Sequence, residues 1–136
     1  MIELRQKISG IIGVLVGYIT HYYTNLETTM KVLIGFMIID FILGIIGGYI
    51  EKKLSSNAIW RGGVRKGIVF LVIIVANNLA LLTGFEMLSD FVIMYYVAME
   101  TLSIFEHAIA LDVPLPQVLI DFAEKLKKVN DRGEHE

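Results

Sequence analysis

Carboxyl and carboxamide side chains interrupt long apolar stretches of this 136-residue chain. The stretch over residues 32–50 contains Asp40, the stretch over 67–85 contains Asn77 and Asn78, and the stretch over 91–111 contains Glu100. Such groups can join helices by hydrogen bonds, line an aqueous lumen or relay protons. They do not predict an enzyme, because no nucleophile accompanies the acids and the sequence has no glycine-rich phosphate loop or nucleophile elbow.

The elements that must position these groups are predicted to be membrane-spanning helices, which need about 20 apolar residues each. Four stretches are candidates, at residues 8–23, 32–50, 67–85 and 91–111, of which the first is short and the fourth is unusually polar. The chain is 55% hydrophobic and 19% charged, with a mean hydropathy of +0.64. Soluble domains are less apolar and more charged. We therefore expect one all-α integral membrane domain over residues 1–136 with about four transmembrane helices.

Basic residues concentrate in three segments of the chain, 1–7, 51–66 and 112–136. Together these segments hold all twelve lysines and arginines except Lys31. The middle segment is predicted to be a basic loop, and it carries Lys52, Lys53, Arg61, Arg65 and Lys66. Because basic residues remain on the cytoplasmic side of a membrane, an even number of spans with both termini in the cytoplasm is expected.

The C-terminal segment has a helical pattern of its own. Pro114 and Pro116 end the fourth stretch, since proline cannot continue a helix. Apolar residues then recur every three or four positions through residues 115–130, with lysines between them. This pattern predicts an amphipathic helix in the cytoplasm that lies on the inner leaflet or pairs with copies of itself.

Alignment of the predicted spans by their midpoints places Asp40, Asn77, Asn78 and Glu100 at nearly the same depth. No lysine or arginine is expected at that depth, so the acids should be protonated, hydrogen-bonded to the asparagines, or wetted within an assembly. Ser103 and His107 extend the polar stripe of the fourth stretch at helical spacing from Glu100. Hydrogen-bonded helix contacts and a lumen both fit this pattern. A proton relay fits less well, because no continuous chain of ionisable residues reaches both surfaces.

Small residues at four-residue spacing predict close helix packing in the membrane. These pairs are Gly13 with Gly17 and Gly44 with Gly48, and the second pair shares a helix face with Asp40. The chain has no cysteine, and its three histidines are remote from one another in sequence, so neither a metal site nor a cofactor is predicted. No aromatic and basic stripe indicates nucleic acid.

Two sequence blocks resemble the toxin-secretion and phage-lysis holins, a family that includes the clostridial toxin-secretion holin. The first block comprises Asp40-Phe-Ile-Leu-Gly44, Lys52-Lys53-Leu54-Ser55-Ser56 and Arg61-Gly62-Gly63-Val64-Arg65-Lys66. The second comprises Glu100-Thr-Leu-Ser103-Ile104-Phe-Glu106 and Pro114-Leu-Pro116. Together they cover residues 33–126. The chain departs from the family at His107, where asparagine is frequent, at Asp112, where glycine is usual, and at Asn77 and Asn78, whose region often holds an aspartate.

The resemblance implies a phage- or prophage-encoded protein of the host bacterial cell membrane. Such a protein forms homo-oligomers in the lipid bilayer and makes lesions on cue, which release a cytoplasmic endolysin and cause host lysis. The endolysin is a functional partner that needs no direct contact, and some relatives serve toxin release instead. The alternatives are a small ion or proton channel or transporter subunit, and a non-conducting membrane scaffold.

Overall fold

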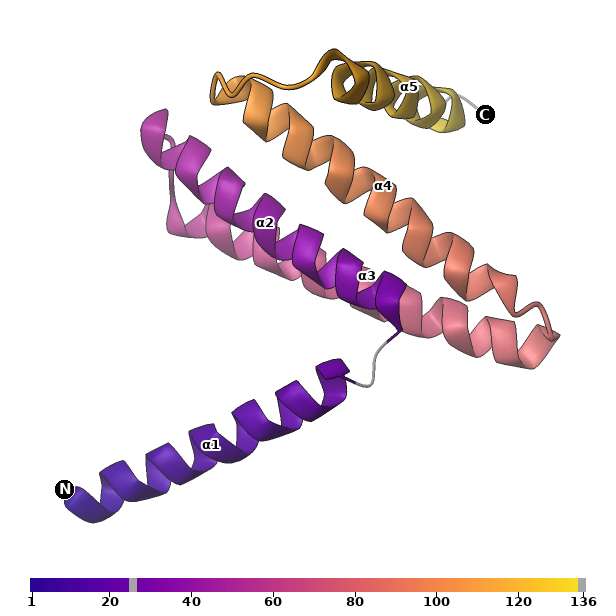
Figure 1. Ribbon diagram of the computed structural model, residues 1–136. Helices are drawn as coiled ribbons and strands as arrows, with labels where there is room; N and C mark the ends of the chain where they lie inside the picture. Colours follow the sequence, from indigo (N-terminus) through magenta and orange to yellow (C-terminus); the bar gives the residue numbers. More distant parts are fainter. Residues whose placement is uncertain (25–26, 135–136) are drawn as a thin grey trace.

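The computed structural model describes residues 1–24 and 27–134, and every regular element in these ranges is an α-helix (Figure 1). The helices are α1 (Ile2–Thr24), α2 (Thr28–Ile50), α3 (Ser56–Thr83), α4 (Met87–Ala110) and α5 (Gln117–Glu134). Three of them, α2, α3 and α4, are long and apolar enough to cross a membrane. The all-α class is therefore confirmed, and the helices have the character of a membrane protein.

A bundle of α2, α3 and α4 forms the body of the molecule. Helix α4 packs against both α2 and α3, and α5 packs against α4 (Figure 1). Short connections reverse the chain between α2 and α3 and again between α3 and α4, so consecutive helices of the bundle run antiparallel. The level that a residue occupies in the bundle is therefore set by its distance from these two turns.

Helix α1 stands apart from this bundle (Figure 1). All of its side chains that the structure describes are exposed. It is not among the helices that meet the requirements of length and apolarity for a span, because Glu3, Arg5 and Lys7 confine the apolar run to its later part. The fourth span predicted at residues 8–23 is therefore not confirmed and stays a prediction.

Helix α3 begins at Ser56, well before the predicted start at residue 67. The hydroxyl of Ser55 caps it by accepting a hydrogen bond from the N–H of Ala58 at 3.1 Å. Of the predicted basic loop, only Lys52 and Lys53 lie in the connection. The prediction of a loop is wrong for Arg61, Arg65 and Lys66, because the serine cap starts the helix before them. At its other end, α3 stops at Gly84, which has the left-handed backbone of a helix cap (φ 72°).

Helix α4 ends in a left-handed cap without glycine. Asp112 has φ 57°, and the N–H of Val113 donates to the carbonyl oxygen of Ala108 at 2.9 Å. Glycine adopts this conformation most easily, and aspartate tolerates it better than most side chains. Asp112 thus occupies a backbone position that favours glycine and tolerates aspartate.

Helix α5 extends beyond the predicted residue 130 and ends at Glu134. Ala123 is buried, whereas Val118, Phe122 and Val129 are exposed on another face. Its apolar residues recur at three- or four-residue spacing with charged residues between them, so the helix is amphipathic, as the sequence predicted. Its cytoplasmic location stays a prediction.

The apolar core lies between α2, α3 and α4. It consists of Leu33, Met37, Ile73 and Ile93, and Leu33 is 0% exposed. Most other large apolar side chains of the bundle face outward, as expected of helices surrounded by lipid. Because lipid tails are as apolar as the core, the helices are held together by packing and polar contacts more than by removal of apolar surface from water.

Leu33→Ala tests the packing of this core. Truncation removes van der Waals contacts at a site with no exposure, and the free energy of unfolding should fall by about 2–5 kcal/mol. Ile38→Ala is the control on the same helix, where the side chain is 55% exposed, and it should change stability by about 0.5 kcal/mol or less. Sodium dodecyl sulfate titration in mixed micelles, followed by circular dichroism, measures both. Equal effects of the two substitutions would contradict this arrangement.

Candidate functional site: an ion cluster in the helical bundle

Charged residues recur at a seven-residue offset from the apolar core of the bundle. Asp40 follows Leu33 by seven positions, Lys66 precedes Ile73 by seven, and Glu100 follows Ile93 by seven. Seven residues are almost two helical turns, so each pair shares one face and lies about 10 Å apart along its helix. Helix α3 runs antiparallel to α2 and α4. Lys66, which precedes the core residue of α3, therefore lies at the same level as Asp40 and Glu100, which follow the core residues of α2 and α4.

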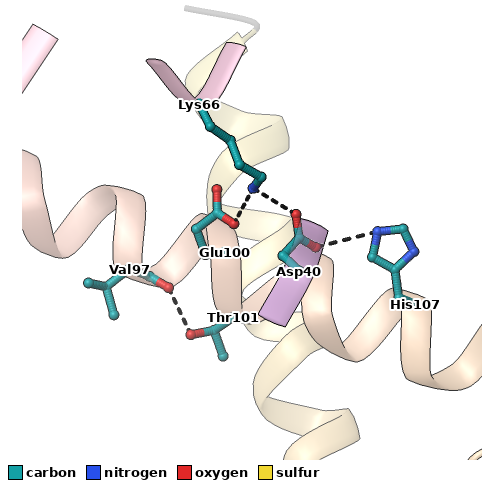
Figure 2. A network of polar contacts seen from close by, with 6 residues as sticks. All are labelled: Asp40, Lys66, Val97, Glu100, Thr101 and His107. Atoms are coloured by element: carbon teal, nitrogen blue, oxygen red, sulfur yellow. Dashed lines mark hydrogen bonds and ion pairs between the residues drawn. The ribbon is translucent and has the colours of Figure 1, made fainter. Parts of the chain in front are cut away.

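At this level a single ammonium group bridges two carboxylates from different helices (Figure 2). Lys66 Nζ donates to Asp40 Oδ2 at 2.9 Å and to Glu100 Oε2 at 2.7 Å. The three side chains are only 19%, 12% and 13% exposed, respectively. Both contacts are therefore short, charge-assisted hydrogen bonds in surroundings that are largely shielded from water. They join α2, α3 and α4 at one point.

His107 adds a second contact to Asp40. Its Nε2 lies 3.4 Å from Asp40 Oδ1, on the side of the carboxylate away from Lys66 (Figure 2). Oδ1 is buried and accepts no hydrogen bond from the residues that the structure describes. We refer to Asp40, Lys66, Glu100 and His107 as the ion cluster. When the imidazole is neutral, two carboxylates face one ammonium and the cluster carries an excess of negative charge.

The expectation that no basic side chain lies at the depth of the acids is wrong. It followed from assigning Lys66 to a loop, whereas the residue lies in the third turn of α3 and its long side chain reaches both acids. A signal for it was present in the sequence as the seven-residue offset from Ile73. That signal becomes interpretable only once α3 is known to begin before Lys66.

The asparagines do not pair with the acids. Asn77 and Asn78 are exposed, and Asn78 Nδ2 donates to the carbonyl oxygen of Ile74 in its own helix at 2.8 Å. They follow Lys66 by more than ten residues, which places them about 16 Å further along α3. The structure therefore separates them from the ion cluster.

Ser103 and the glycines occupy different surroundings. Ser103 lines a cavity of about 540 Å³ beside α3 and α4, together with Glu100 and His107. A Cβ at Gly44 would lie 3.6 Å from His107 Nε2, and a Cβ at Gly48 would lie 3.2 Å from a Leu54 methyl carbon, so both glycines allow close approach. Around Gly13 and Gly17 nothing lies within 4 Å of such a Cβ.

The chemistry of the cluster is that of charge pairing. Within residues 1–24 and 27–134, no group of three histidine or acidic side chains is arranged to hold a metal ion. The ammonium already occupies the space between the two carboxylates. The fold and site together define an α-helical membrane protein with a charged layer inside its bundle.

Comparison with known proteins places the chain in a family. A model of the bacteriophage holin family matches residues 17–128, which include the whole ion cluster. A probable holin of Bacillus phage phi105 is 36% identical over 96 residues, covering 70% of this chain and 71% of the relative. An uncharacterized protein of Clostridium perfringens is 34% identical over 103 residues, covering 74% of each chain. YqxH of Bacillus subtilis, also uncharacterized, is 28% identical over 107 residues, covering 78% of this chain and 76% of the relative.

The chain belongs to the bacteriophage holin family. This confirms the resemblance that its two sequence blocks indicated. No solved structure matches the fold. Membership in the family indicates a membrane protein without enzymatic activity.

Removal of the central cation tests the pairing. Lys66→Leu leaves two carboxylates facing each other without a counter-charge, and the free energy of unfolding should fall by about 3–5 kcal/mol. The combined variant Asp40→Leu, Lys66→Leu, Glu100→Leu replaces every member of the triad by an apolar side chain. Its stability should return to that of the wild type or exceed it. Titration with sodium dodecyl sulfate in mixed micelles compares the three chains. If the combined variant were as unstable as Lys66→Leu, unpaired charge would not be the cause.

Proposed function

We propose that this chain permeabilises the bacterial cytoplasmic membrane as a homo-oligomer and so releases an endolysin, or a toxin, that lacks its own route out of the cell. The observation that carries the proposal is the bridge from Lys66 to Asp40 and Glu100 inside the bundle. It is supported by the family match and by the similarity to a probable holin.

The ion cluster suits a protein that must first be harmless and later leaky. In a single bundle Lys66 pairs with both carboxylates and compensates most of their charge, so the chain can remain in the bilayer without opening a path for ions. Pairing in a dry environment compensates incompletely for lost hydration, so the same groups are stabilised when water reaches them. An assembly that turns these faces toward a common lumen would hydrate the cluster. Association of enough copies would then favour the open state.

The experiment is induced expression in a bacterial host, with membrane potential and culture density followed with and without a cytoplasmic endolysin. The wild-type chain should depolarise the membrane abruptly after a delay, and culture density should fall only when endolysin is present. A healthy, polarised culture at high expression would contradict the proposal. It would favour a channel, transporter subunit or scaffold that shares only the fold of the family.

The charge-free variant Asp40→Leu, Lys66→Leu, Glu100→Leu should insert and accumulate but fail to permeabilise, because its core lacks the three charged side chains that water stabilises most strongly. The control is Glu51→Gln with Lys53→Gln, which removes an exposed ion pair of 3.8 Å in the α2–α3 connection. That control should lyse on the wild-type schedule. Unchanged lysis timing in the charge-free variant would show that the ion cluster is not required for the lesion.

We further propose that α1 is a fourth span. The α2–α3 connection and α5 both carry lysines, and positive charge favours the cytoplasm. If α1 also crosses, Arg5 and Lys7 lie on that same side. Gly13 and Gly17, which have open space around them, then form a surface on which copies can associate.

A protease-cleavable tag on the N-terminus tests this topology in spheroplasts. With four spans the tag is protected from external protease until the membrane is disrupted, whereas with three spans it is cleaved at once. The same tag inserted beside Glu86, in the α3–α4 connection, is the control and should be cleaved in intact spheroplasts. Cleavage of both tags would overturn the four-span arrangement.

A further inference from the structure

A cavity of about 200 Å³ adjoins the ion cluster at the end of the bundle where α2 stops and α3 begins. Asp40, Lys66 and His107 line it at the level of the ion cluster. Leu54 and Ala58 lie at its other end, and both are exposed. The cavity therefore runs from the surface of the bundle end to the buried carboxylate.

Asp40 lines this cavity and has a hydrogen-bonding capacity that the described residues leave unused. The residue is 9% exposed, and Lys66 binds only its Oδ2. Oδ1 accepts no hydrogen bond within the described part of the chain, and His107 Nε2 stands 3.4 Å from it. A buried carboxylate oxygen requires donors, and a neutral imidazole at this distance supplies little.

The cavity is large enough to hold water, and although most of its lining is apolar, Asp40, Lys66 and His107 offer polar partners where it meets the ion cluster. Each water needs about 30 Å³ and two to four polar partners, so this volume has room for several molecules beside Asp40, Lys66 and His107. We propose that the cavity is a water-filled vestibule, open to the cytoplasm, whose water donates to Asp40 Oδ1 before any lesion forms. The vestibule rests on the proposed function for its orientation toward the cytoplasm. It adds to that function the place where water first enters the core.

Small residues keep this space open. A Cβ at Gly44 would be 3.6 Å from His107 Nε2, and a Cβ at Gly62 would be 3.6 Å from the Phe41 ring. A methyl group fits at either position, whereas a leucine at Gly44 would occupy the space in front of His107. Gly35 lies earlier on α2, and a Cβ there has nothing within 4 Å. Gly44→Leu should therefore fill the vestibule, and Gly35→Leu should not affect it.

The absence of natural cysteine from the chain allows a direct test with single thiols. Ile45 lines the cavity, whereas its neighbour Ile46 is 43% exposed on the outer surface of α2, where lipid is expected. Ile45→Cys and Ile46→Cys thus compare two environments at almost the same depth. A thiol reacts as the thiolate, which forms where water reaches it and is disfavoured in apolar surroundings.

The probe is a membrane-impermeant, charged methanethiosulfonate, applied to inverted vesicles from polarised cells collected before lysis. Ile45→Cys should react about tenfold faster than Ile46→Cys, because only its thiol meets water. Gly44→Leu in the Ile45→Cys chain should slow the reaction to the rate of Ile46→Cys, and Gly35→Leu should leave it unchanged. Labelling of denatured protein confirms that each thiol is present.

Equal rates at the two positions, a faster reaction at Ile46→Cys, or no effect of Gly44→Leu would overturn the vestibule. Faster reaction from right-side-out vesicles than from inverted ones would overturn its opening to the cytoplasm. These results are separable from the proposed function, since labelling precedes lysis. If the chain permeabilises cells but Ile45→Cys is not labelled, only the vestibule is contradicted. If Ile45→Cys is labelled but the chain never permeabilises cells, only the proposed lesion is contradicted.

Discussion

One ammonium group shared by two carboxylates is the constraint on which the bundle depends. Lys66 holds Asp40 of α2 and Glu100 of α4 at once, so the three helices must stay in register at that level. A slide of one helical turn, about 5.4 Å, would leave charges unpaired in apolar surroundings. Apolar packing alone specifies register less strictly, because lipid contacts differ little from contacts between helices. We infer that the ion cluster contributes specificity more than net stability.

The charged layer and the apolar layer follow from one sequence period. Leu33, Ile73 and Ile93 form the apolar layer, and the residue seven positions away on each helix belongs to the ion cluster. A bundle with this pattern is close-packed at one level and polar at the next. The polar level adjoins both the cavity at the α2–α3 end and the cavity beside α3 and α4. The ion cluster is therefore the level of the bundle at which polar side chains border both spaces.

Much of the architecture was predictable because membrane helices consist of long runs of apolar residues. The predicted stretches at 32–50 and 91–111 correspond closely to α2 and α4, and the family followed from sequence blocks that the family comparison confirms. Helix α3 begins before the predicted stretch at 67–85, because the charged residues that precede this stretch belong to the helix. A serine cap at Ser55 marks its start instead. This one boundary decides both that Lys66 lies in a helix and that the acids have a partner.

The sequence by itself determined the class of protein, the all-helical fold, the acids within apolar helices and the membership in the holin family. Those properties depend on composition, on short-range periodicity and on local motifs, which can be recognised in a single sequence. Only the tertiary structure decided which polar groups meet. It joined Lys66 to Asp40 and Glu100 and left Asn77 and Asn78 on the surface. The physical reason is that partners across three helices depend on where each helix begins and how antiparallel neighbours align. A shift of a few residues in one helix boundary changes every pair.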